Sequence, residues 1–370
     1  MSGMLNYKCP CCGGTVEFNA GTQTMKCPFC DTEFDVEALQ QKEKQQEEKK
    51  EDHYHWSETA SQQWAEDETT GLVVYACKSC GGEIVGDENM GATQCPYCGS
   101  QIVLSGKFAG DLKPDYVIPF KLDKKQAKAA FEKFISDKKY APKMFKSQKH
   151  IDEIKGIYVP FWLFDADVEG EASYDATNVE SFVEGDYDVT VTEHFDVFRR
   201  GTMNFTNIPV DGSSRIADDM MESIEPFNFD EAVEFNTAYL AGFAADKYDV
   251  DAEGSIDRAN QRIKESMELA LRETVRGYSG RGGHRIYDGV HLKWSSVDIE
   301  NGKAKYALYP VWMLSATYEG KPYTFAMNGQ TGKFVGDLPI DKKALNKYFW
   351  KCTGIVGAVL YAATLALLLI

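Results

Sequence analysis

Eight cysteines of the sequence fall into four C-x-x-C pairs, a spacing that binds metal ions. Within each group of four, the two pairs are separated by 14 residues. A tetrahedral Zn²⁺ ion takes four thiolates at about 2.3 Å, and two such pairs joined by a β-hairpin supply them. We therefore predict two structural zinc ions, with the metal ligands Cys9, Cys12, Cys27, Cys30, Cys77, Cys80, Cys95 and Cys98.

The residues around these pairs favour tight turns. Proline follows the first ligand in three of the pairs, and glycine usually follows the second, where the backbone needs a positive φ. Asp31 stands in place of glycine once, and Cys11 occupies the variable position between two ligands, so we treat it as a non-ligand. The alternatives are redox C-x-x-C motifs or core cysteines without metal. A closed four-cysteine site leaves no position for water or substrate, so no catalytic residue is assigned.

The composition is that of a globular chain from a reducing compartment. The 370 residues carry a formal net charge of −17, which argues against a large surface that neutralises phosphates. Ten cysteines are too few for a disulfide scaffold in a chain of this size. The first residues contain no apolar core typical of a secretory signal.

Two internal repeats organise the chain. The cysteine pattern recurs at an offset of 68, which predicts one zinc ribbon at 1–35 and a second at 72–106. The stretch 36–71 is rich in Gln, Glu and Lys and is predicted to be a charged helical or disordered linker. A weaker repeat, at an offset of 150, aligns the run from Pro160 with the run from Pro310.

Each copy of the weaker repeat is preceded by a strand-like run and an amphipathic helix. The predicted strands are Tyr116 to Lys121 and Thr237 to Ala241, and the predicted helices are Lys124 to Asp137 and Ile256 to Thr274. Alternation in Val168 to Thr177 and Asp188 to Phe198 adds antiparallel sheet. The predicted fold class is therefore α+β: two small β zinc ribbons, an α+β domain at 107–340 with an internal β-α-β pseudo-repeat, and a carboxy-terminal transmembrane helix.

That transmembrane helix is predicted at 348–370. Cys352 to Ile370 carries no charge and would span about 28 Å as a helix, against roughly 30 Å of hydrocarbon. Nearby lysines predict a single-pass protein of the cell membrane, with its amino-terminal domains in the cytoplasm. A buried helix of the globular domain, or a truncated sequence, would give the same apolar run. Small residues at every fourth position offer a surface for association with another helix: Gly354, Ala358, Ala362 and Ala366.

Familiar catalytic motifs are absent from the sequence, which contains no G-x-x-x-x-G-K-[ST], H-E-x-x-H or G-x-S-x-G. The basic, glycine-rich stretch from Arg276 to Arg285 is interpreted as an ordinary loop rather than an anion cradle. The six histidines show no ligand spacing. We therefore predict that the protein is not an enzyme.

Several runs resemble a family of bacterial membrane-anchored proteins with transcription-factor-IIB-type (TFIIB-type) zinc ribbons, whose members are sometimes labelled primosomal replication-restart helicases. The runs are Tyr75 to Val85, Cys95 to Gly99, Asp115 to Phe120, Ile157 to Trp162, Pro209 to Ser214 and Phe325 to Lys333. The helicase label does not fit a chain without a nucleotide-binding loop. The resemblance implies a role in envelope stress modules, with peripheral partners of the phage-shock type.

These observations favour a membrane-anchored, non-enzymatic adaptor or scaffold that binds protein partners at the cytosolic membrane face. The alternative is a nucleic-acid-binding zinc-ribbon protein, which the acidic second ribbon makes the weaker hypothesis. The third hypothesis is an enzyme with an unfamiliar site in the α+β domain.

Overall fold

The computed structural model describes residues 9, 15–37, 51–57, 63–65, 68–87, 94–107, 112–147, 151–275, 277–279, 283–285 and 287–368. The chain divides into two compact units, each assembled from separate segments. Unit 1 comprises Met1–Ser57, Asp165–Thr206 and Asn260–Gly302, and unit 2 comprises Glu58–Phe164, Asn207–Ala259 and Lys303–Ile370. Three long strands, β9 (Lys155–Glu184), β10 (Tyr187–Asp211) and β15 (Gly289–Tyr318), contribute residues to both units.

The first cysteine-rich segment of unit 1 forms a small antiparallel sheet. Strands β1 (Glu17–Asn19), β2 (Thr24–Lys26) and β3 (Glu33–Phe34) pair in sequence order. Gln23 adopts a positive φ of 58° in the turn between β1 and β2. The buried core of this sheet is only Cys9, Val16, Met25 and Cys27, so a bound metal would supply much of its stability.

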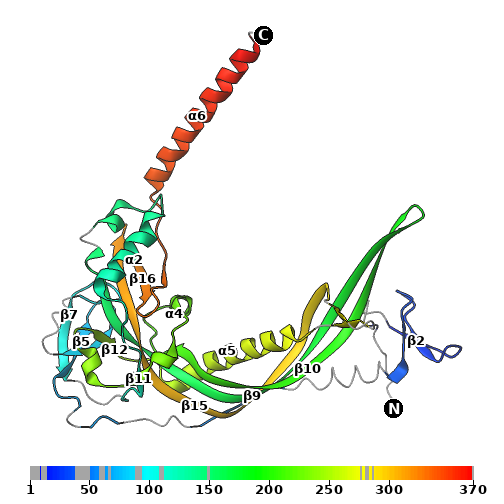
Figure 1. Cartoon of the computed structure of the whole chain (residues 1–370), viewed down its shortest axis with the longest axis horizontal. Helices are drawn as coiled ribbons and strands as arrows, with labels where there is room; N and C mark the ends of the chain where they lie inside the picture. The colour runs from blue at the N-terminus through cyan, green and yellow to red at the C-terminus, as the bar shows by residue number, and fades with distance from the viewer. Residues whose placement is uncertain are drawn as a thin grey trace. The chain divides into compact units, whose positions relative to one another are not determined.

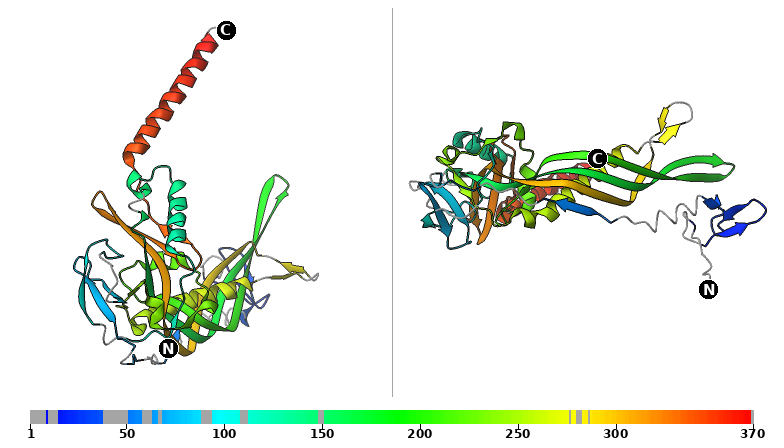
Figure 2. Two further views of the ribbon diagram at one scale, coloured as in Figure 1. Left: turned by 60° about the vertical axis from the view of Figure 1, so that its left-hand side comes forward. Right: turned by 90° about the horizontal axis from the view of Figure 1, so that it is seen from below.

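The rest of unit 1 is a curved layer of strands with one helix on it. Helix α5 (Ala252–Glu273) lies along β9, β10 and β15, and these strands run side by side (Figures 1 and 2). Residues alternate along β9, so that Val168, Ala172 and Tyr174 are buried. The Tyr174 hydroxyl donates a hydrogen bond to the Glu268 carbonyl of α5 at 3.2 Å, which identifies this as the covered face.

A short strand extends this layer from a stretch that the composition assigns to a linker. Strand β4 (His53–Trp56) lies within 36–71 and pairs in parallel with β15. The Trp56 indole N–H donates to the Asn260 side chain of α5 at 2.9 Å. The carboxylate of Asp52 accepts from Lys264 at 2.6 Å, so two side-chain contacts join β4 to α5.

Unit 2 contains the strand order β11-β8-β15-β9-β12-β6-β5-β7. Its shorter strands are β5 (Leu72–Cys77), β6 (Glu83–Asp87), β7 (Ile102–Lys107), β8 (Tyr116–Val117), β11 (Val233–Glu234) and β12 (Ala244–Asp246). Strand β16 (Lys321–Asn328) pairs with β15 and with β17 (Phe334–Gly336). The second ribbon, β5 to β7, is therefore part of the large sheet and is packed into the core of unit 2.

The two short parallel strands of unit 2 pair reciprocally. Strand β8 precedes β9 in the chain but pairs with β15, whereas β12 precedes β15 but pairs with β9. The contacts are equivalent on the long strands, because Val117 pairs with Leu308 and Ala245 pairs with Tyr158, and Tyr158 and Leu308 are related by the offset of 150. Each half of the repeat thus completes the sheet of the other half.

Helix α2 (Lys124–Ser136) covers one side of β16 (Figure 1). Asp123 caps its start, since the carboxylate accepts from the Gln126 amide and the Gln126 side chain accepts from the Asp123 amide. Phe131 and Ile135 point into a core that includes Phe325. The remaining described helical segments are α4 (Asp218–Ile224), α6 (Lys342–Leu368), η1 (Lys143–Lys146), η2 (Phe229–Glu231) and η3 (Thr237–Leu240).

The predicted fold class is wrong as stated. Twelve of the described strands form one mixed sheet, which dominates the structure and extends through residues assigned to the second ribbon, the linker and the α+β domain. The strand predicted at Thr237 to Ala241 is the 3-10 helix η3, and the strand of that repeat is β12, at Ala244–Asp246. Asn236 explains the difference, because its side chain accepts from the Ala238 amide and so starts a helical turn.

The predicted transmembrane helix at 348–370 is also wrong, and the single-pass membrane localisation is corrected with it. Within the described part of the chain, no helix is long and apolar enough to cross a membrane. The helix that covers the apolar run, α6, begins at Lys342. Its first ten residues include Lys342, Lys343, Lys347 and Lys351. The run from Cys352 alone suggested a uniformly apolar helix, but these lysines are part of the same helix.

Candidate metal centres

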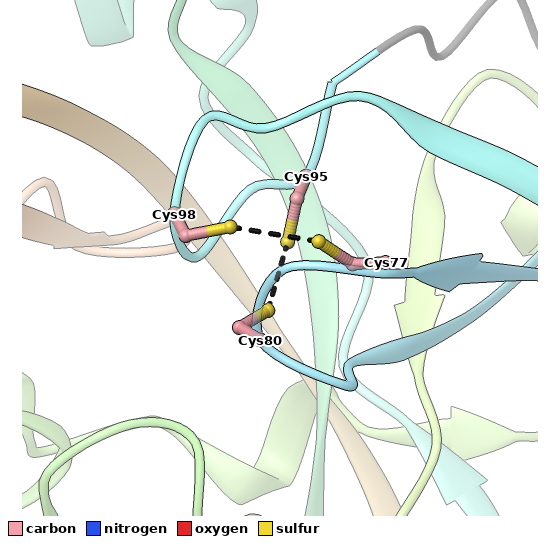
Figure 3. Close-up of side chains that lie close together, drawn as sticks. All are labelled: Cys77, Cys80, Cys95 and Cys98. Atoms are coloured by element: carbon pink, nitrogen blue, oxygen red, sulfur yellow. Dashed lines mark hydrogen bonds between the residues drawn. The ribbon is translucent and has the colours of Figure 1, made fainter.

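The four cysteines of the second ribbon converge on one point. Cys77 ends β5, Cys80 follows in the same turn, and Cys95 and Cys98 lie in the turn before β7. Their sulfur atoms point toward one another, with 3.5 Å between Cys77 and Cys98 and 3.6 Å between Cys80 and Cys95 (Figure 3). All four lie within 4.8 Å of one another, so the cluster could hold a metal ion.

Backbone hydrogen bonds shape both turns of this site in the same way. The Gly81 amide donates to the Cys77 carbonyl at 2.8 Å, and the Gly99 amide donates to the Cys95 carbonyl at 3.0 Å. Both glycines have a positive φ, of 75° and 72°, which a side chain would strain. The position after the second cysteine therefore requires a residue that tolerates a positive φ, which glycine does without strain.

The thiols of this site differ in their readiness to ionise. Burial raises the pKa of Cys80 and Cys95. Burial also acts to raise the pKa of Cys98, but hydrogen bonds from the side chain and backbone of Ser100 lower it to about 6. A thiolate is the form that binds a metal ion, so metal binding would release the protons that burial keeps on Cys80 and Cys95.

The first ribbon brings together three of its four predicted ligands. Cys9, Cys27 and Cys30 lie with their sulfur atoms within 4.8 Å of one another, and Cys9 and Cys30 are 3.6 Å apart. Cys12 lies outside the described residues. Asp31 has a φ of 57° and its amide donates to the Cys27 carbonyl at 2.9 Å, so it takes the place that Gly81 and Gly99 hold in the second ribbon. A hydrogen bond from the Thr32 side chain lowers the pKa of Cys30 to about 6.

The second cluster is joined to the core of unit 2 by contacts that the spacing of the cysteines did not reveal. The Ser315 hydroxyl donates to the Pro96 carbonyl at 2.7 Å, and the Lys155 ammonium donates to the Gln94 carbonyl at 2.5 Å. These contacts hold the turn that carries Cys95 and Cys98. No pattern in the sequence links Lys155 or Ser315 to the ribbon, because both are brought there by the long strands β9 and β15.

A buried polar group also lies behind this turn. Tyr97 stands between Cys95 and Cys98 in the sequence and is buried, and its hydroxyl lies near the carboxylate of Asp246. Burial and the nearby carboxylate of Asp246 raise its pKa. Asp246 is itself buried and accepts a hydrogen bond from Ser213 at 2.6 Å, while Arg215 lies 3.3 Å away. The turn that carries Cys95 and Cys98 is therefore linked through Tyr97 to a charged network of the β12 region.

The other sequence features occupy separate places. The stretch 276–285 contains a two-stranded hairpin of β13 (Gly277–Ser279) and β14 (Gly283–Arg285). Trp162 and Trp312 are buried in the core. Gly354, Ala358 and Ala362 lie exposed on α6, whereas the side chain of Ala366 lies outside the described set. None of the eight described cysteines forms a disulfide.

Comparison with known proteins gives one relative and no fold precedent. No family model matches the chain, and no solved structure matches it. The uncharacterized protein YdjG of Bacillus subtilis (strain 168) is 33% identical over 366 residues, which cover 99% of this chain and 98% of that protein. The similarity thus includes the ribbons, both compact units and α6. The chain belongs to the same protein family as YdjG.

Proposed function

We propose that this protein is a non-enzymatic adaptor that binds protein partners through two zinc ribbons of the TFIIB type. Zinc suits the donor set, because four thiolates at tetrahedral angles and about 2.3 Å from the ion would be about 3.8 Å apart. The sulfur separations of 3.5 and 3.6 Å in the second cluster are close to that edge. An ion bound by four cysteines has no open position, which favours a structural role.

The observation that carries the adaptor function is the surface of the ribbons. Exposed apolar side chains occur on both: Phe18 and Phe29 on the first, and Val103 and Leu104 on the second. Contiguous exposed apolar patches mark protein docking sites, and these side chains are the candidate anchors of such a patch. In the described part of the first ribbon Lys26 is the one cation, and it already lies 3.4 Å from Asp31 and 3.8 Å from Glu33. Phosphate binding therefore has little support there.

The test compares two exposed leucines in the intact chain. Leu104 on β7 is 61% exposed and Leu269 on α5 is 59% exposed, so Leu104→Asp and Leu269→Asp make the same chemical change on different elements. Proteins crosslinked to the wild type in cells would be quantified against both variants. We expect Leu104→Asp to lose specific partners, with phage-shock-type peripheral proteins the first candidates, and Leu269→Asp to retain them.

Two results would contradict the proposal. Equal partner sets for the wild type and Leu104→Asp would remove the ribbon as a docking site. Salt-dependent binding of DNA or RNA by the purified chain, weakened by the same substitution, would favour the nucleic-acid hypothesis instead. Circular dichroism and metal content of both variants would establish that each still folds.

A further inference from the structure

The layer of unit 1 has a second face, which α5 does not cover. Along β9 and β15 the residues that alternate with the buried ones are acidic: Asp167 and Glu169 on β9, and Asp298 and Glu300 on β15. Val297 and Ile299 of β15 are buried, so the carboxylates between and beyond them face the opposite side. We call this surface, with His53 and His55 of β4, the acidic face.

The acidic face is hollowed. A cavity of about 560 Å³ is lined by the four carboxylate residues, by both histidines and by residues of β10, including Thr202 and Asn204. All of these residues belong to unit 1. The volume is in the range of pockets that hold a small molecule or a few side chains.

Two of the four carboxylates are held in place by neighbours. The side chains of Asn204 and Asn301 donate to the two oxygens of Asp167 at 2.6 and 2.9 Å. These hydrogen bonds lower the pKa of Asp167 and so keep it ionised. Glu169 forms an ion pair with Arg200. The floor of the cavity is thus fixed before any ligand arrives.

The other two carboxylates are available to a ligand. Within the described structure, Asp298 and Glu300 form no hydrogen bond or ion pair through their side chains. Asp298 is half-buried and Glu300 is exposed. The Arg200 guanidinium, which is paired with Glu169 and Glu171, also interacts electrostatically with Asp298, so one cation is shared among three carboxylates. A ligand cation that approached the cavity would therefore still meet an excess of negative charge.

The distances between the carboxylates and histidines of the cavity argue against a metal ion and favour the basic side chains of a peptide as the ligand. Outside the two cysteine clusters, no described group of three or more His, Cys, Asp or Glu residues brings its ligand atoms within 4.8 Å of one another, so the cavity does not have the geometry of a metal site. Carboxylates two residues apart on a strand lie about 6.6 to 6.8 Å apart. An extended peptide presents every second side chain at the same repeat.

We propose that the acidic face binds an extended, lysine- or arginine-bearing segment of a protein partner, with basic side chains at alternate positions paired to the carboxylates of β9 and β15. The inference rests on the adaptor function proposed above and names the chemistry of one segment that the adaptor takes. Charge complementarity carries it, together with the match between the two-residue repeat of the strands and that of an extended ligand.

The test uses the purified full-length chain and a defined probe. A fluorescein-labelled ten-residue peptide with lysine at every second position and serine between would be titrated against the wild type and against D298N/E300Q. We expect the double variant to bind about fivefold more weakly, since each exposed ion pair contributes modestly. Raising the salt from 0.1 to 1 M should abolish binding, because the screening length falls from about 10 to 3 Å.

Two controls separate this site from the general attraction of an acidic protein for polycations. E180Q/E184Q removes the same charge from exposed positions of β9 that do not line the cavity, and it should change the affinity less than twofold. A peptide of the same composition with its lysines in one block should bind more weakly than the alternating peptide. Equal loss in both double variants, or equal affinity for both peptides, would overturn the inference.

Further outcomes are equally decisive. Competition by millimolar Mg²⁺ beyond the effect of matched ionic strength would identify a divalent-cation site and overturn the peptide site. If the wild type does not bind the peptide but its captured partners still depend on Leu104, the acidic-face inference alone is refuted. If the wild type binds the peptide but no captured partner depends on Leu104, the ribbon adaptor alone is refuted.

Discussion

Trp162 and Trp312 make the same contact in the two halves of the repeat. The Trp162 indole N–H donates to the Val250 carbonyl at 2.9 Å, just after β12, and that of Trp312 donates to the Leu122 carbonyl at 3.0 Å, just after β8. Each tryptophan therefore fixes the chain that leaves the short strand paired beside it. The carbonyls of Pro160 and Pro310 accept from Gly212 and Gly329 at 2.9 and 2.8 Å, so the equivalence extends to the backbone.

Replacing either tryptophan with phenylalanine should destabilise unit 2 to a similar extent. Trp162→Phe and Trp312→Phe each remove one buried hydrogen bond and leave a small void, which together cost about 2–4 kcal/mol. Chemical denaturation would measure both. Trp350→Phe is the control, because Trp350 is 70% exposed on α6 and should change stability by less than about 0.5 kcal/mol. A loss in one core variant only would show that the two contacts are not equivalent.

Metal should leave the two clusters at different rates. The second cluster is packed into the large core of unit 2, whereas the core of the first ribbon is four buried residues. A colorimetric chelator should therefore release about one zinc per chain quickly, from the first ribbon, and about one slowly. Cys30→Ser should abolish the fast phase alone. A single phase, or less than one zinc per chain after careful purification, would contradict the assignment.

Loss of a ligand in the second cluster should destabilise the large sheet. Cys95→Ser removes a buried thiolate from the turn held by Ser315 and Lys155, and we expect a loss of about 4 kcal/mol or more together with one zinc per chain. Cys352→Ser is the matched control, since Cys352 lies on α6 outside both clusters. Its stability and metal content should equal those of the wild type. A stable Cys95→Ser protein that kept both metal ions would refute the site.

The stability of unit 2 should depend on pH through Asp211. Burial, with repulsion from Asp218, raises the pKa of Asp211 to about 7, well above its value near 4 in an unfolded chain. Between these values the folded state holds the extra proton, so this residue makes stability fall as pH rises from about 4 to about 7.

Asp211→Asn removes this dependence. The variant should gain stability relative to the wild type as pH increases, by up to about 4 kcal/mol above pH 7. Urea unfolding from pH 5 to 8 measures the difference. Asp219→Asn, at an exposed position of α4, should parallel the wild type at every pH. A constant offset between Asp211→Asn and the wild type would show that the carboxyl does not titrate in this range.

The cysteine clusters could be predicted because their chemistry is local. Two C-x-x-C turns and a hairpin need only a few residues on either side, and the turn glycines appear directly in the sequence. Helix α2 could be predicted for the same reason, since its capping residues Asp123 and Gln126 and the residues of its buried face are close together in the chain. Local signals of this kind do not depend on the rest of the fold.

The large sheet could not be predicted, because its pairings join residues far apart. Strand β8 has two residues and β12 has three, too few to show a periodicity. Neither strand gives any sign that it pairs with the long strand of the other repeat. Asp246 is a further example, since an aspartate in a short strand gave no signal that it would be buried near Tyr97 and Ser213.

The apolar run at the carboxy terminus led to a different error. The prediction used the composition of this run without the lysine-bearing turns that precede it in the same helix, α6.

The acidic face could not be predicted for a related reason. Asp167 and Glu169 read as ordinary exposed positions of a strand, and only the pairing of β9, β15 and β4 places them beside Asp298, Glu300 and the histidines.

The reciprocal pairing of β8 with β15 sets an order of events during protein synthesis. Asp115, which precedes β8, binds the Tyr306 amide, and 191 residues separate the two in the chain. At 5–20 residues per second, the ribosome needs about 10–40 s to make that interval. The first half of the repeat therefore leaves the ribosome with an unpaired strand and has to wait for the second half. Premature association of that strand with another chain is the hazard that this architecture creates.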